Sequence, residues 1–288
     1  MQIAGAVALI TGAERGLGRA LALALAARGA RIVASGLEWE PLDALRATIE
    51  AAGGQALAVP CDVRNRAEID ALVGAAVAAF GAVDLLVNNA GITVGGDIRL
   101  VCDVEWERVL DVNLRGAVRA VGAVLPGMLA RGRGHIVNVA SAAGLAAPAL
   151  WIPYAVSKFA LVGFSEGLHA ALRPHGIAVS VACPMWLQTD MHASTRPRLA
   201  GPPPGHARRR LPPGWIWFTS HLRGRPLRAD VAARLIVRGI ERGRFMIYTH
   251  RATRWLVLAR ALAPNAFAGL WQRANQLDED RHRQAAPG

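Results

Sequence analysis

Short apolar runs alternate with longer amphipathic blocks from the start of the chain to about residue 181. The apolar runs, rich in β-branched residues, predict strands at residues 7–10, 31–35, 56–59, 85–88, 135–139 and 178–181. The blocks between them predict helices near residues 17–28, 41–52, 66–80, 104–130 and 155–173. This alternation predicts an α/β fold, a single doubly wound Rossmann-type domain whose parallel strands are joined by right-handed crossovers. The strands are nearly all apolar, as expected where helices cover both faces of a sheet.

The alternation ends after Val181. Residues 184–228 are rich in Pro, Gly, Arg and Trp, and their proline clusters exclude long helices. A loop of this length within a compact domain is usually a binding segment or a mobile one, and we expect a substrate-binding lid. We therefore expect one α/β domain at residues 1–250 and a C-terminal helical extension at residues 251–288.

Regular patterns return after this segment. They predict a helix near residues 229–242, a short strand at residues 245–248, and then an apolar stretch at residues 255–271 that Pro264 splits. The stretch is shorter than the roughly 20 residues that a membrane-spanning helix needs. Tryptophan at each end and arginines around it suit peripheral contact with an anionic membrane surface. The favoured alternative is a helix pair that covers the pocket or contacts another subunit.

The net charge of +12 is concentrated in the last third of the chain. Residues 196–288 hold 18 arginines and five acidic residues, whereas residues 1–195 hold 15 basic and 16 acidic ones. The basic character therefore concerns the partners of the last third and not the fold. Because no recognition module accompanies the arginine cluster at residues 208–210, we expect a solvated loop there, and nucleic acid is not an expected partner.

Cysteine usage indicates a reducing compartment. Cys61, Cys102 and Cys183 are scattered and form no CxxC pair, so neither a disulfide framework nor a metal site is predicted. The first ten residues have no charged region followed by a long apolar run, and we expect no signal peptide. Together these features predict a cytoplasmic protein.

The first strand leads directly into a glycine-rich turn and a helix rich in Ala and Leu. The turn reads Thr11-Gly12-Ala13-Glu14-Arg15-Gly16-Leu17-Gly18. Such a turn can bind the pyrophosphate of a dinucleotide, because glycines let the backbone approach and the first helical N–H groups favour negative charge. An ordinary βα turn is the alternative. The position at the first strand of an α/β alternation favours the dinucleotide site.

Two further groups follow strands on the same edge of the predicted sheet. Asp62 and Val63 follow the third strand, where Asp62 accepts from an adenine amino group or caps a helix. The run Asn88-Asn89-Ala90-Gly91 ends the fourth strand. Loops at the carboxyl ends of parallel strands meet the ligand in folds of this class, so this run has a structural or cofactor role unless it is a plain turn.

The scarcest residues of the chain stand together. Lys158 is the only lysine among 33 basic residues, and Tyr154, one of two tyrosines, precedes it by one helical turn. A lone lysine in a chain that otherwise uses arginine indicates a place where a compact ammonium is required. The ammonium is expected to favour the phenolate of Tyr154, whose ordinary pKa of roughly 10 is too high for a base at neutral pH.

Ser141, at the end of the fifth strand, completes a candidate catalytic group. Its hydroxyl could hold a substrate oxygen while Tyr154 moves the proton and a hydride passes between the carbinol carbon and a nicotinamide. The alternative is a Tyr and a Lys on the surface of an amphipathic helix. The scarcity of both residue types and the upstream serine favour the catalytic interpretation.

These motifs, in this order, resemble those of the short-chain dehydrogenase/reductase family over residues 5 to about 191. They are Thr11-Gly12-x-x-x-Gly16-x-Gly18, Asp62, Asn88-Asn89-Ala90-Gly91, Asn113, Ser141, Tyr154-x-x-x-Lys158, and Pro184 with Thr189. The resemblance implies the catalytic residues Asn113, Ser141, Tyr154 and Lys158. It also implies the cofactor residues Gly12, Arg15, Gly16, Leu17, Gly18, Asp62, Val63, Asn89, Ala90, Gly91, Tyr154, Lys158, Pro184 and Thr189.

Particular roles follow from the same resemblance. Asn113 would hold a helix kink and a water that relays protons to Lys158, Lys158 would also bond the nicotinamide ribose, and Thr189 would meet the carboxamide. The helices at residues 104–130 and 155–173 would form a homodimer or homotetramer.

The chain departs from the family pattern at two places. The residue after Pro184 is usually Gly and is here Met185, which places bulk beside the nicotinamide. The second strand ends in Ser35-Gly36-Leu37, without the acid that NAD-preferring members use to hold the ribose. The missing acid leaves room for a 2′-phosphate that Arg15 could pair with, which slightly favours NADP(H) over NAD(H). Glu38 could still reach the ribose and reverse that preference.

Large apolar residues surround the expected substrate position. They are Leu145, Trp151, Met185, Trp186, Leu187, Trp215, Trp217 and Phe218. Because ligand pockets are mostly apolar, this set predicts a bulky apolar alcohol or ketone such as a lipid, terpenoid, steroid or polycyclic aromatic. The equal alternative is that the tryptophans pack the lid or an oligomer interface.

Two other classes of function remain open at this point. One is a non-catalytic nucleotide sensor or scaffold on the same fold, which would not need Asn113, Ser141, Tyr154 and Lys158 together. The other is an adaptor that binds a membrane surface or nucleic acid through the arginine-rich end, whose signature would be salt-sensitive binding without turnover.

Overall fold

The structure is a computed structural model that describes residues 1–188 and 226–285, with side chains described up to Gln276. A seven-stranded parallel sheet forms its centre, in the order β3-β2-β1-β4-β5-β6-β9. The strands are β1 Val7–Thr11, β2 Arg31–Gly36, β3 Ala56–Pro60, β4 Leu85–Asn88, β5 Gly134–Val139, β6 Ile177–Cys183 and β9 Met246–Tyr248. A separate parallel pair joins β7 Leu187–Gln188 to β8 Leu227–Arg228.

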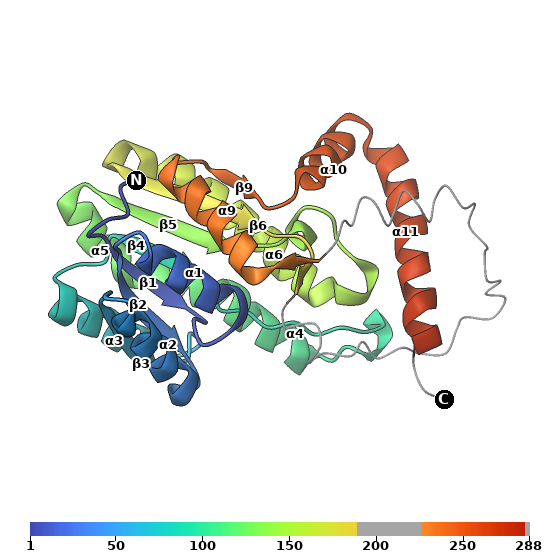
Figure 1. Cartoon of the computed structure of the whole chain (residues 1–288). Coiled ribbons are helices and arrows are strands. Elements are labelled where there is room, and N and C mark those ends of the chain that lie inside the picture. Colours follow the sequence, from blue (N-terminus) through green and yellow to red (C-terminus); the bar gives the residue numbers. More distant parts are fainter. Residues whose placement is uncertain (189–225, 286–288) are drawn as a thin grey trace.

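Helices cover both faces of the sheet (Figure 1). They are α1 Gly16–Ala26, α2 Trp39–Ala51, α3 Arg66–Phe80, α4 Asp103–Leu110, α5 Gly116–Arg131, α6 Ile152–Leu172, α9 Ala229–Glu241, α10 Arg251–Leu262 and α11 Pro264–Ala285. One core cluster holds residues of α1, α2 and α9, and the other holds residues of α3, α5 and α6. The doubly wound α/β domain expected from the sequence is therefore confirmed.

Strand β1 shows why the strands read as continuous apolar runs. Its successive side chains point to opposite faces, so Val7 and Leu9 enter the cluster with α3 and α5, while Ala8 and Ile10 enter the cluster with α1 and α9. All four are buried. A strand covered on both faces is mostly apolar, and the alternation of an exposed sheet is absent.

The strand order places a ligand crevice next to β1. The chain runs from β1 outward through β2 to β3, and then returns to the other side of β1 with β4. Connections therefore diverge at the carboxyl ends of β1 and β4, the topological switch point at which open parallel sheets bind their ligands. The glycine turn after Thr11 and the amide pair after Asn88 both lie at this edge.

Two segments differ from the sequence prediction. The single helix expected at residues 104–130 is divided into α4, a π-helical turn at Asp111–Arg115, and α5. The apolar stretch expected at residues 255–271 is part of two longer helices, α10 and α11, and α11 continues to Ala285. Pro264 does separate the stretch into two helices, as its missing N–H requires.

His135 is a buried titratable group at the start of β5, with 1% of its surface exposed. Its Nε2 lies 2.8 Å from Ser180 Oγ, and the Ser180 hydroxyl donates to the Arg244 carbonyl at 2.7 Å. The serine oxygen must then accept from His135, which places the hydrogen on Nε2. Nδ1 is buried and has no hydrogen-bond partner among the described residues. Burial lowers the pKa of His135 from 6.5 to about 4.

We expect this histidine to make the fold sensitive to acid. The unfolded chain binds a proton as the pH falls below about 6.5, whereas the folded chain resists until about pH 4, so stability is lost across that window by at most about 3 kcal/mol. Urea unfolding of the wild type and of His135→Gln at several pH values measures the effect. The difference between their unfolding free energies should move in favour of the variant as the pH falls, and parallel curves would contradict the assignment.

Candidate active site

The glycine turn after β1 is held in a tight form by close backbone contacts. Gly12 and Gly16 have positive φ angles of 62° and 55°, which glycine adopts without strain. A Cβ on Gly12 would lie 2.8 Å from the Cα of Ala90, and a Cβ on Gly18 would overlap the carbonyl oxygen of Gly12. The turn after β1 therefore packs directly on the turn after β4, and neither glycine leaves room for a side chain.

Asn89 links these two turns. Its Nδ2 donates to the carbonyl oxygens of Thr11 at 3.0 Å and Gly12 at 2.9 Å. In return, Thr11 Oγ1 accepts from the backbone N–H groups of Asn89 and Ala90, each at 3.1 Å. These four hydrogen bonds, two from the Asn89 side chain and two to Thr11 Oγ1, give the run a structural role, which is to join the two turns. The other amide, Asn88, donates to Asn138 Oδ1 at 2.8 Å within the sheet.

The N-terminus of α1 fits the pyrophosphate of a dinucleotide. No side chain caps the helix at Arg15, and its first turn contains no acidic residue. Within residues 1–188 and 226–276, no side chain accepts from the first helical N–H groups of Gly16, Leu17 and Gly18, which lie at the positive end of the helix dipole. Neither Gly12 nor Gly18 has room for a Cβ, so no side chain from these positions covers the turn. These residues fit the anion, and they come from the segment that the sequence predicts.

Two acidic side chains lie near the end of β2, although Ser35, Gly36 and Leu37 are not acidic. Arg15 forms an exposed ion pair with Glu38, the residue before α2. The carboxylate of Glu14 lies against Gly36, the last residue of β2, because a Cβ at Gly36 would overlap it. Glu14 Oε2 is buried and has no hydrogen-bond partner among the described residues. Arg15, the expected partner of a 2′-phosphate, is thus already paired with a carboxylate.

Asp62 and Val63 follow β3, as expected. Both carboxylate oxygens of Asp62 accept from the Arg64 guanidinium, and Arg64 lowers the pKa of Asp62 through these bonds. Val63 is buried against Gly116 at the start of α5. The carboxylate is ionised and available as an acceptor, although Arg64 competes with any adenine amino group for it.

Tyr154, Lys158 and Ser141 come together at the end of β5. Lys158 and Tyr154 lie one turn apart on α6, with Lys158 Nζ 5.6 Å from the centre of the tyrosine ring. Nζ donates to the Val139 carbonyl at 2.8 Å, and the Tyr154 hydroxyl is hydrogen-bonded to Ser141. Both Tyr154 and Lys158 are buried. The structural alternative of a surface Tyr and Lys is therefore excluded.

Burial determines the charge states of this pair. It raises the pKa of the Tyr154 phenol, against the smaller opposite effect of the hydrogen bond to Ser141. It lowers the pKa of the Lys158 ammonium to about 8. The net shift of the Tyr154 pKa is therefore away from the phenolate, because desolvation of the phenolate outweighs the attraction expected from the Lys158 ammonium. At neutral pH the site holds a protonated phenol beside a charged lysine.

Asn113 occupies the π-helical turn and connects three elements. Its Oδ1 accepts from the Ile92 N–H at 2.8 Å, and its Nδ2 donates to the Ile92 carbonyl and to Ser157 Oγ, each at 2.9 Å. Ser157 donates onward to the Tyr154 carbonyl at 2.7 Å. The helix irregularity implied by the family resemblance is present at Asn113. Its side-chain amide is engaged by protein groups, and the implied water relay stays a prediction.

Gly91 joins the cofactor side of the site to the catalytic side. A Cβ there would lie 3.6 Å from Lys158 Nζ and 3.4 Å from Asn113 Oδ1. The loop after β4 therefore brings Asn89, Ala90 and Gly91 against both the glycine turn and the lysine. A ligand bound at the α1 N-terminus would extend towards Lys158.

The substrate-side residues lie on two loops. Leu145 is buried and Trp151 half-buried in the loop between Ser141 and α6, and Gly95 lies against the Trp151 ring, with no room for a Cβ. Pro184 is buried after β6 and accepts from the Ala142 N–H at 2.9 Å.

The two residues that follow Pro184 carry the departure from the family pattern. Met185 is half-buried, and Trp186 is 44% exposed with a φ of 44°, a left-handed conformation that costs about 1–3 kcal/mol for a bulky residue. Whether this bulk lies beside a nicotinamide stays a prediction. Thr189, the residue implied to meet the carboxamide, and Trp215, Trp217 and Phe218 lie outside the described residues.

The C-terminal helix pair contacts the loop that carries Leu145 and Trp151. Trp271 Nε1 donates to the Ala147 carbonyl at 2.6 Å, and the Ala149 N–H donates to Asn275 Oδ1 at 2.8 Å. The Arg260 guanidinium donates to the Leu145 carbonyl and lies 5.0 Å from the centre of the Phe159 ring. The extension therefore supports the loop between Ser141 and Tyr154.

Three groups of the site were not identified from the sequence. In the sequence, Ser157 is an unspecified position between Tyr154 and Lys158. In the structure it is fully buried, accepts from Asn113 and donates to the Tyr154 carbonyl. Burial raises the pKa of Cys183, which interacts electrostatically with both Tyr154 and Lys158, to about 12, so it remains a thiol. In the sequence, Glu14 is one of the unspecified positions between Gly12 and Gly16. No local pattern could have found these residues, because their contacts come from distant segments.

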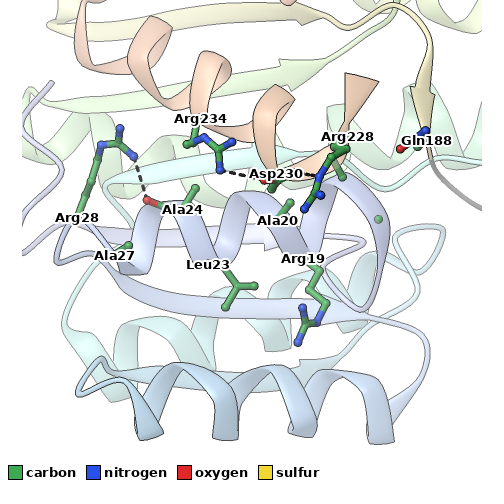
Figure 2. Close-up of a pocket in the computed structure, with 12 residues that line it drawn as sticks. Arg19, Ala20, Leu23, Ala24, Ala27, Arg28, Gln188, Arg228, Asp230 and Arg234 are labelled. Atoms are coloured by element: carbon green, nitrogen blue, oxygen red, sulfur yellow. Dashed lines mark hydrogen bonds and ion pairs between the residues drawn. The ribbon is translucent and has the colours of Figure 1, made fainter. Parts of the chain in front are cut away.

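A groove of about 610 Å³ lies between α1 and α9, outside the catalytic group (Figure 2). Its charged lining is largely paired within the described chain. Asp230 accepts from Arg228 and Arg234, each at 3.0 Å, and Arg28 pairs with Glu241 at 2.7 Å. The groove reaches Gly16 at the start of α1 but contains none of the catalytic candidates. We do not assign it a ligand.

The comparisons with known proteins agree with this geometry. The family model for short chain dehydrogenase matches residues 6–200. The ketoacyl reductase HetN of a Nostoc species is 38% identical over 69% of this chain and 71% of its own length.

Two solved structures are similar over most of the chain. A short chain dehydrogenase/reductase from Burkholderia phymatum in complex with NAD has a TM-score of 0.78 and 34% identity, covering 91% of this chain and 94% of that one. An actinorhodin polyketide ketoreductase variant with NADPH has a TM-score of 0.73 and 34% identity, covering 86% of this chain and 96% of that one. The chain belongs to the short-chain dehydrogenase/reductase family and is a nicotinamide-dependent oxidoreductase acting on CH–OH and C=O groups.

Proposed function

We propose that this protein interconverts a bulky apolar ketone and the corresponding secondary alcohol, with Tyr154 as the acid/base. The observation that carries the proposal is the burial of Tyr154 and Lys158 side by side on α6, with Ser141 hydrogen-bonded to the phenol. Two scarce ionisable residues are thereby desolvated at the ligand-binding edge of the sheet. Perturbed ionisable groups in such a position are typical of catalytic sites.

The roles of the chain's own residues follow from their chemistry. When bound, a reduced nicotinamide supplies the hydride that the carbonyl carbon receives. Ser141 orients the carbonyl oxygen, and Tyr154, protonated at neutral pH, donates its proton to that oxygen. The Lys158 ammonium stabilises the phenolate that remains, because the low dielectric of the buried site strengthens their attraction. Asn113 is a positioning residue that holds α6 through Ser157.

The dinucleotide would occupy the crevice at the β1 and β4 ends. We assign its pyrophosphate to the glycine turn and the α1 N-terminus, its adenine to the neighbourhood of Asp62 and Val63, and its ribose to Lys158. Asn89, Ala90, Gly91, Pro184 and Thr189 complete the proposed cofactor residues. The close packing of Gly12 on Ala90 supports this assignment, because it keeps the crevice floor free of side chains.

NADP(H) is the proposed cofactor, by a small preference. Leu37 and the two residues before it offer no carboxylate from the end of β2, and Arg15 can pair with a 2′-phosphate. Glu38 and Glu14 act against this, because Glu38 competes for Arg15 and Glu14 lies beside Gly36. We therefore expect NADPH to bind more tightly than NADH, by less than about tenfold.

The proposed substrate carries a large apolar group next to the ketone. Leu145, Trp151, Met185 and Trp186 supply apolar surface on the two loops beside Ser141 and Tyr154. The similar proteins named as ketoacyl and polyketide ketoreductases support an acyl or polyketide chain as one member of this class. Few polar anchors are needed when the apolar body fills the pocket.

Assembly and location are parts of the same proposal. A homodimer or homotetramer through α4, α5 and α6 is supported by the exposed apolar residues Val104, Val118 and Val156 on these helices. A cytoplasmic location is supported by the three free cysteines. The division into a domain at residues 1–250 and an extension at residues 251–288 also stands as a proposal.

The decisive experiment follows nicotinamide absorbance with the purified full-length chain. NADPH and NADH are each tested against ketones graded from acetone to steroid-sized compounds, together with a 3-oxoacyl thioester. We expect kcat/KM to rise with the apolar bulk of the ketone, since each added methylene in a fitting pocket contributes about 1 kcal/mol or more. Faster turnover of acetone-sized ketones would contradict the bulky-substrate proposal. Dinucleotide binding without any turnover would favour the sensor or scaffold.

A further inference from the structure

The C-terminal helix pair has two unlike sides. Its inner side is fixed to the body by Arg260, Trp271 and Asn275, which bond to backbone groups of the loop at residues 145–149. Figure 1 shows α10 and α11 at the periphery of the molecule, away from the central sheet. The outer side of α10 presents large apolar side chains to solvent. Trp255 is 68% exposed, Leu258 is 44% exposed and Leu262 is 75% exposed.

These three residues form a continuous surface, which we name the outer stripe. They are spaced at positions i, i+3 and i+7 of one helix, and such positions share one helical face. The buried residue of α10, Thr253, lies on the opposite face. An amphipathic helix normally turns its apolar face to the core, and α10 turns this one outward. Contiguous exposed apolar surface of this kind marks an interaction site.

The segment of the chain that carries the outer stripe has charges of one sign. The sequence contains six arginines and no acidic residue between Glu241 and Asp278. Arg251 and Arg254, both exposed, precede Trp255 and Leu258 by one turn each and therefore border the stripe. An apolar face with tryptophan and leucine, flanked by arginine and free of carboxylates, is complementary to a bilayer with anionic headgroups.

The dimensions favour contact along a bilayer surface. Helix α10 contains 12 residues, too few to cross a membrane. Within the described part of the chain, no helix is long and apolar enough to span one. A second copy of the chain is a poorer occupant, because it would bring the same arginines against Arg251 and Arg254.

We propose that the outer stripe of α10 docks this protein on the surface of an anionic phospholipid bilayer. Trp255, Leu258 and Leu262 enter the boundary between headgroups and acyl chains, while Arg251 and Arg254 contact the headgroup phosphates. The docked face belongs to the same helix pair that supports the loop between Ser141 and Tyr154, so the loop lies near the lipid. The proposal does not depend on the catalytic activity.

The test is co-sedimentation of the full-length protein with vesicles. One set of vesicles contains phosphatidylcholine alone, and the other contains phosphatidylcholine mixed with phosphatidylserine. We expect the wild type to pellet with the anionic vesicles, with binding that weakens as salt is added. The triple variant Trp255→Gln, Leu258→Gln, Leu262→Gln should bind at least about tenfold more weakly, since each side chain loses apolar burial. The double variant Arg251→Gln, Arg254→Gln should lose the preference for phosphatidylserine.

A matched control uses exposed apolar residues elsewhere. Val77→Gln, Ile98→Gln and Leu100→Gln change side chains that are 45%, 46% and 41% exposed and lie outside the helices of the proposed subunit interface, and the combined variant should bind vesicles as the wild type does. Unchanged circular dichroism and thermal unfolding would show that each variant is folded. Equal binding of the outer-stripe triple variant and the wild type would overturn the proposal. So would a wild type that fails to pellet but forms an oligomer that the triple variant loses.

Discussion

Replacing Tyr154 by phenylalanine lowers kcat by about 10²- to 10⁴-fold and leaves the dissociation constant of NADPH nearly unchanged. The range is that of a positioned general acid/base, and phenylalanine keeps the ring while removing the phenolic proton that we propose is donated to the carbonyl oxygen. The ring packs beside Lys158, and its loss would disturb the cofactor side, so phenylalanine is a better substitution than alanine. The measurement is a steady-state assay with NADPH and a turned-over ketone, beside a fluorescence titration of NADPH.

The chain offers a matched control in its only other tyrosine. Tyr248 lies on β9, and burial raises the pKa of its phenol as it does for Tyr154. It is not bonded to Ser141 among the interactions of the described residues, and Tyr248→Phe should keep kcat within about twofold of the wild type. Equal losses of kcat in the two variants would show that altered packing, and not a missing proton donor, slows the reaction. An unchanged kcat in Tyr154→Phe would show that the phenol takes no part in the proton transfer.

The pH dependence provides a second check on the same pair. Lys158 has a pKa of about 8 in the folded chain, lowered by burial, so its ammonium is lost as the pH rises through about 8. If the ammonium stabilises the Tyr154 phenolate, the rate of ketone reduction should fall on the alkaline side of that value. If Lys158 instead acted as a neutral base, the rate of ketone reduction would rise as the pH passes about 8.

The sequence predicts the architecture well because the required information is local. A strand buried on both faces, such as β1, is apolar over most of its length, and the glycine turn that follows it brings the backbone close to Ala90. The scarcity of lysine and tyrosine identifies Tyr154 and Lys158 without reference to any other protein. Each of these signals is a property of a few adjacent residues.

The remainder could not be predicted, because it depends on contacts between distant segments. Asn113 lies in a π-helical turn and bonds to the backbone of Ile92, and neither residue carries a local sign of that pairing. The direction of the Tyr154 pKa shift depends on how deeply the site is buried, which spacing along a helix does not reveal. The Arg15–Glu38 pair depends on how α2 begins. Local patterns therefore identify the catalytic residues but do not fix their charge states.

A second large effect is expected at Gly18. A Cβ at this position would overlap the Gly12 carbonyl oxygen and lie 2.5 Å from Asn89 Nδ2, and that amide joins the turns after β1 and β4. Gly18→Ala must therefore displace the glycine turn. We expect the dissociation constant of NADPH to rise about 100-fold, because two charge-assisted bonds from α1 amides to the pyrophosphate would be misaligned. The free energy of unfolding should fall by about 1–3 kcal/mol, as for an overpacked core.

Gly74→Ala is the matched control, since Gly74 lies within α3 and a Cβ there meets no atom within 4 Å. That variant should bind NADPH normally and gain about 0.5–1 kcal/mol of stability, because alanine favours the helix over glycine. Fluorescence titration of NADPH and urea unfolding distinguish the two glycines. Normal NADPH binding by Gly18→Ala would show that the pyrophosphate does not lie on the α1 N-terminus. Destabilisation by Gly74→Ala of the same size would show that helix packing, and not the glycine turn, determines the response.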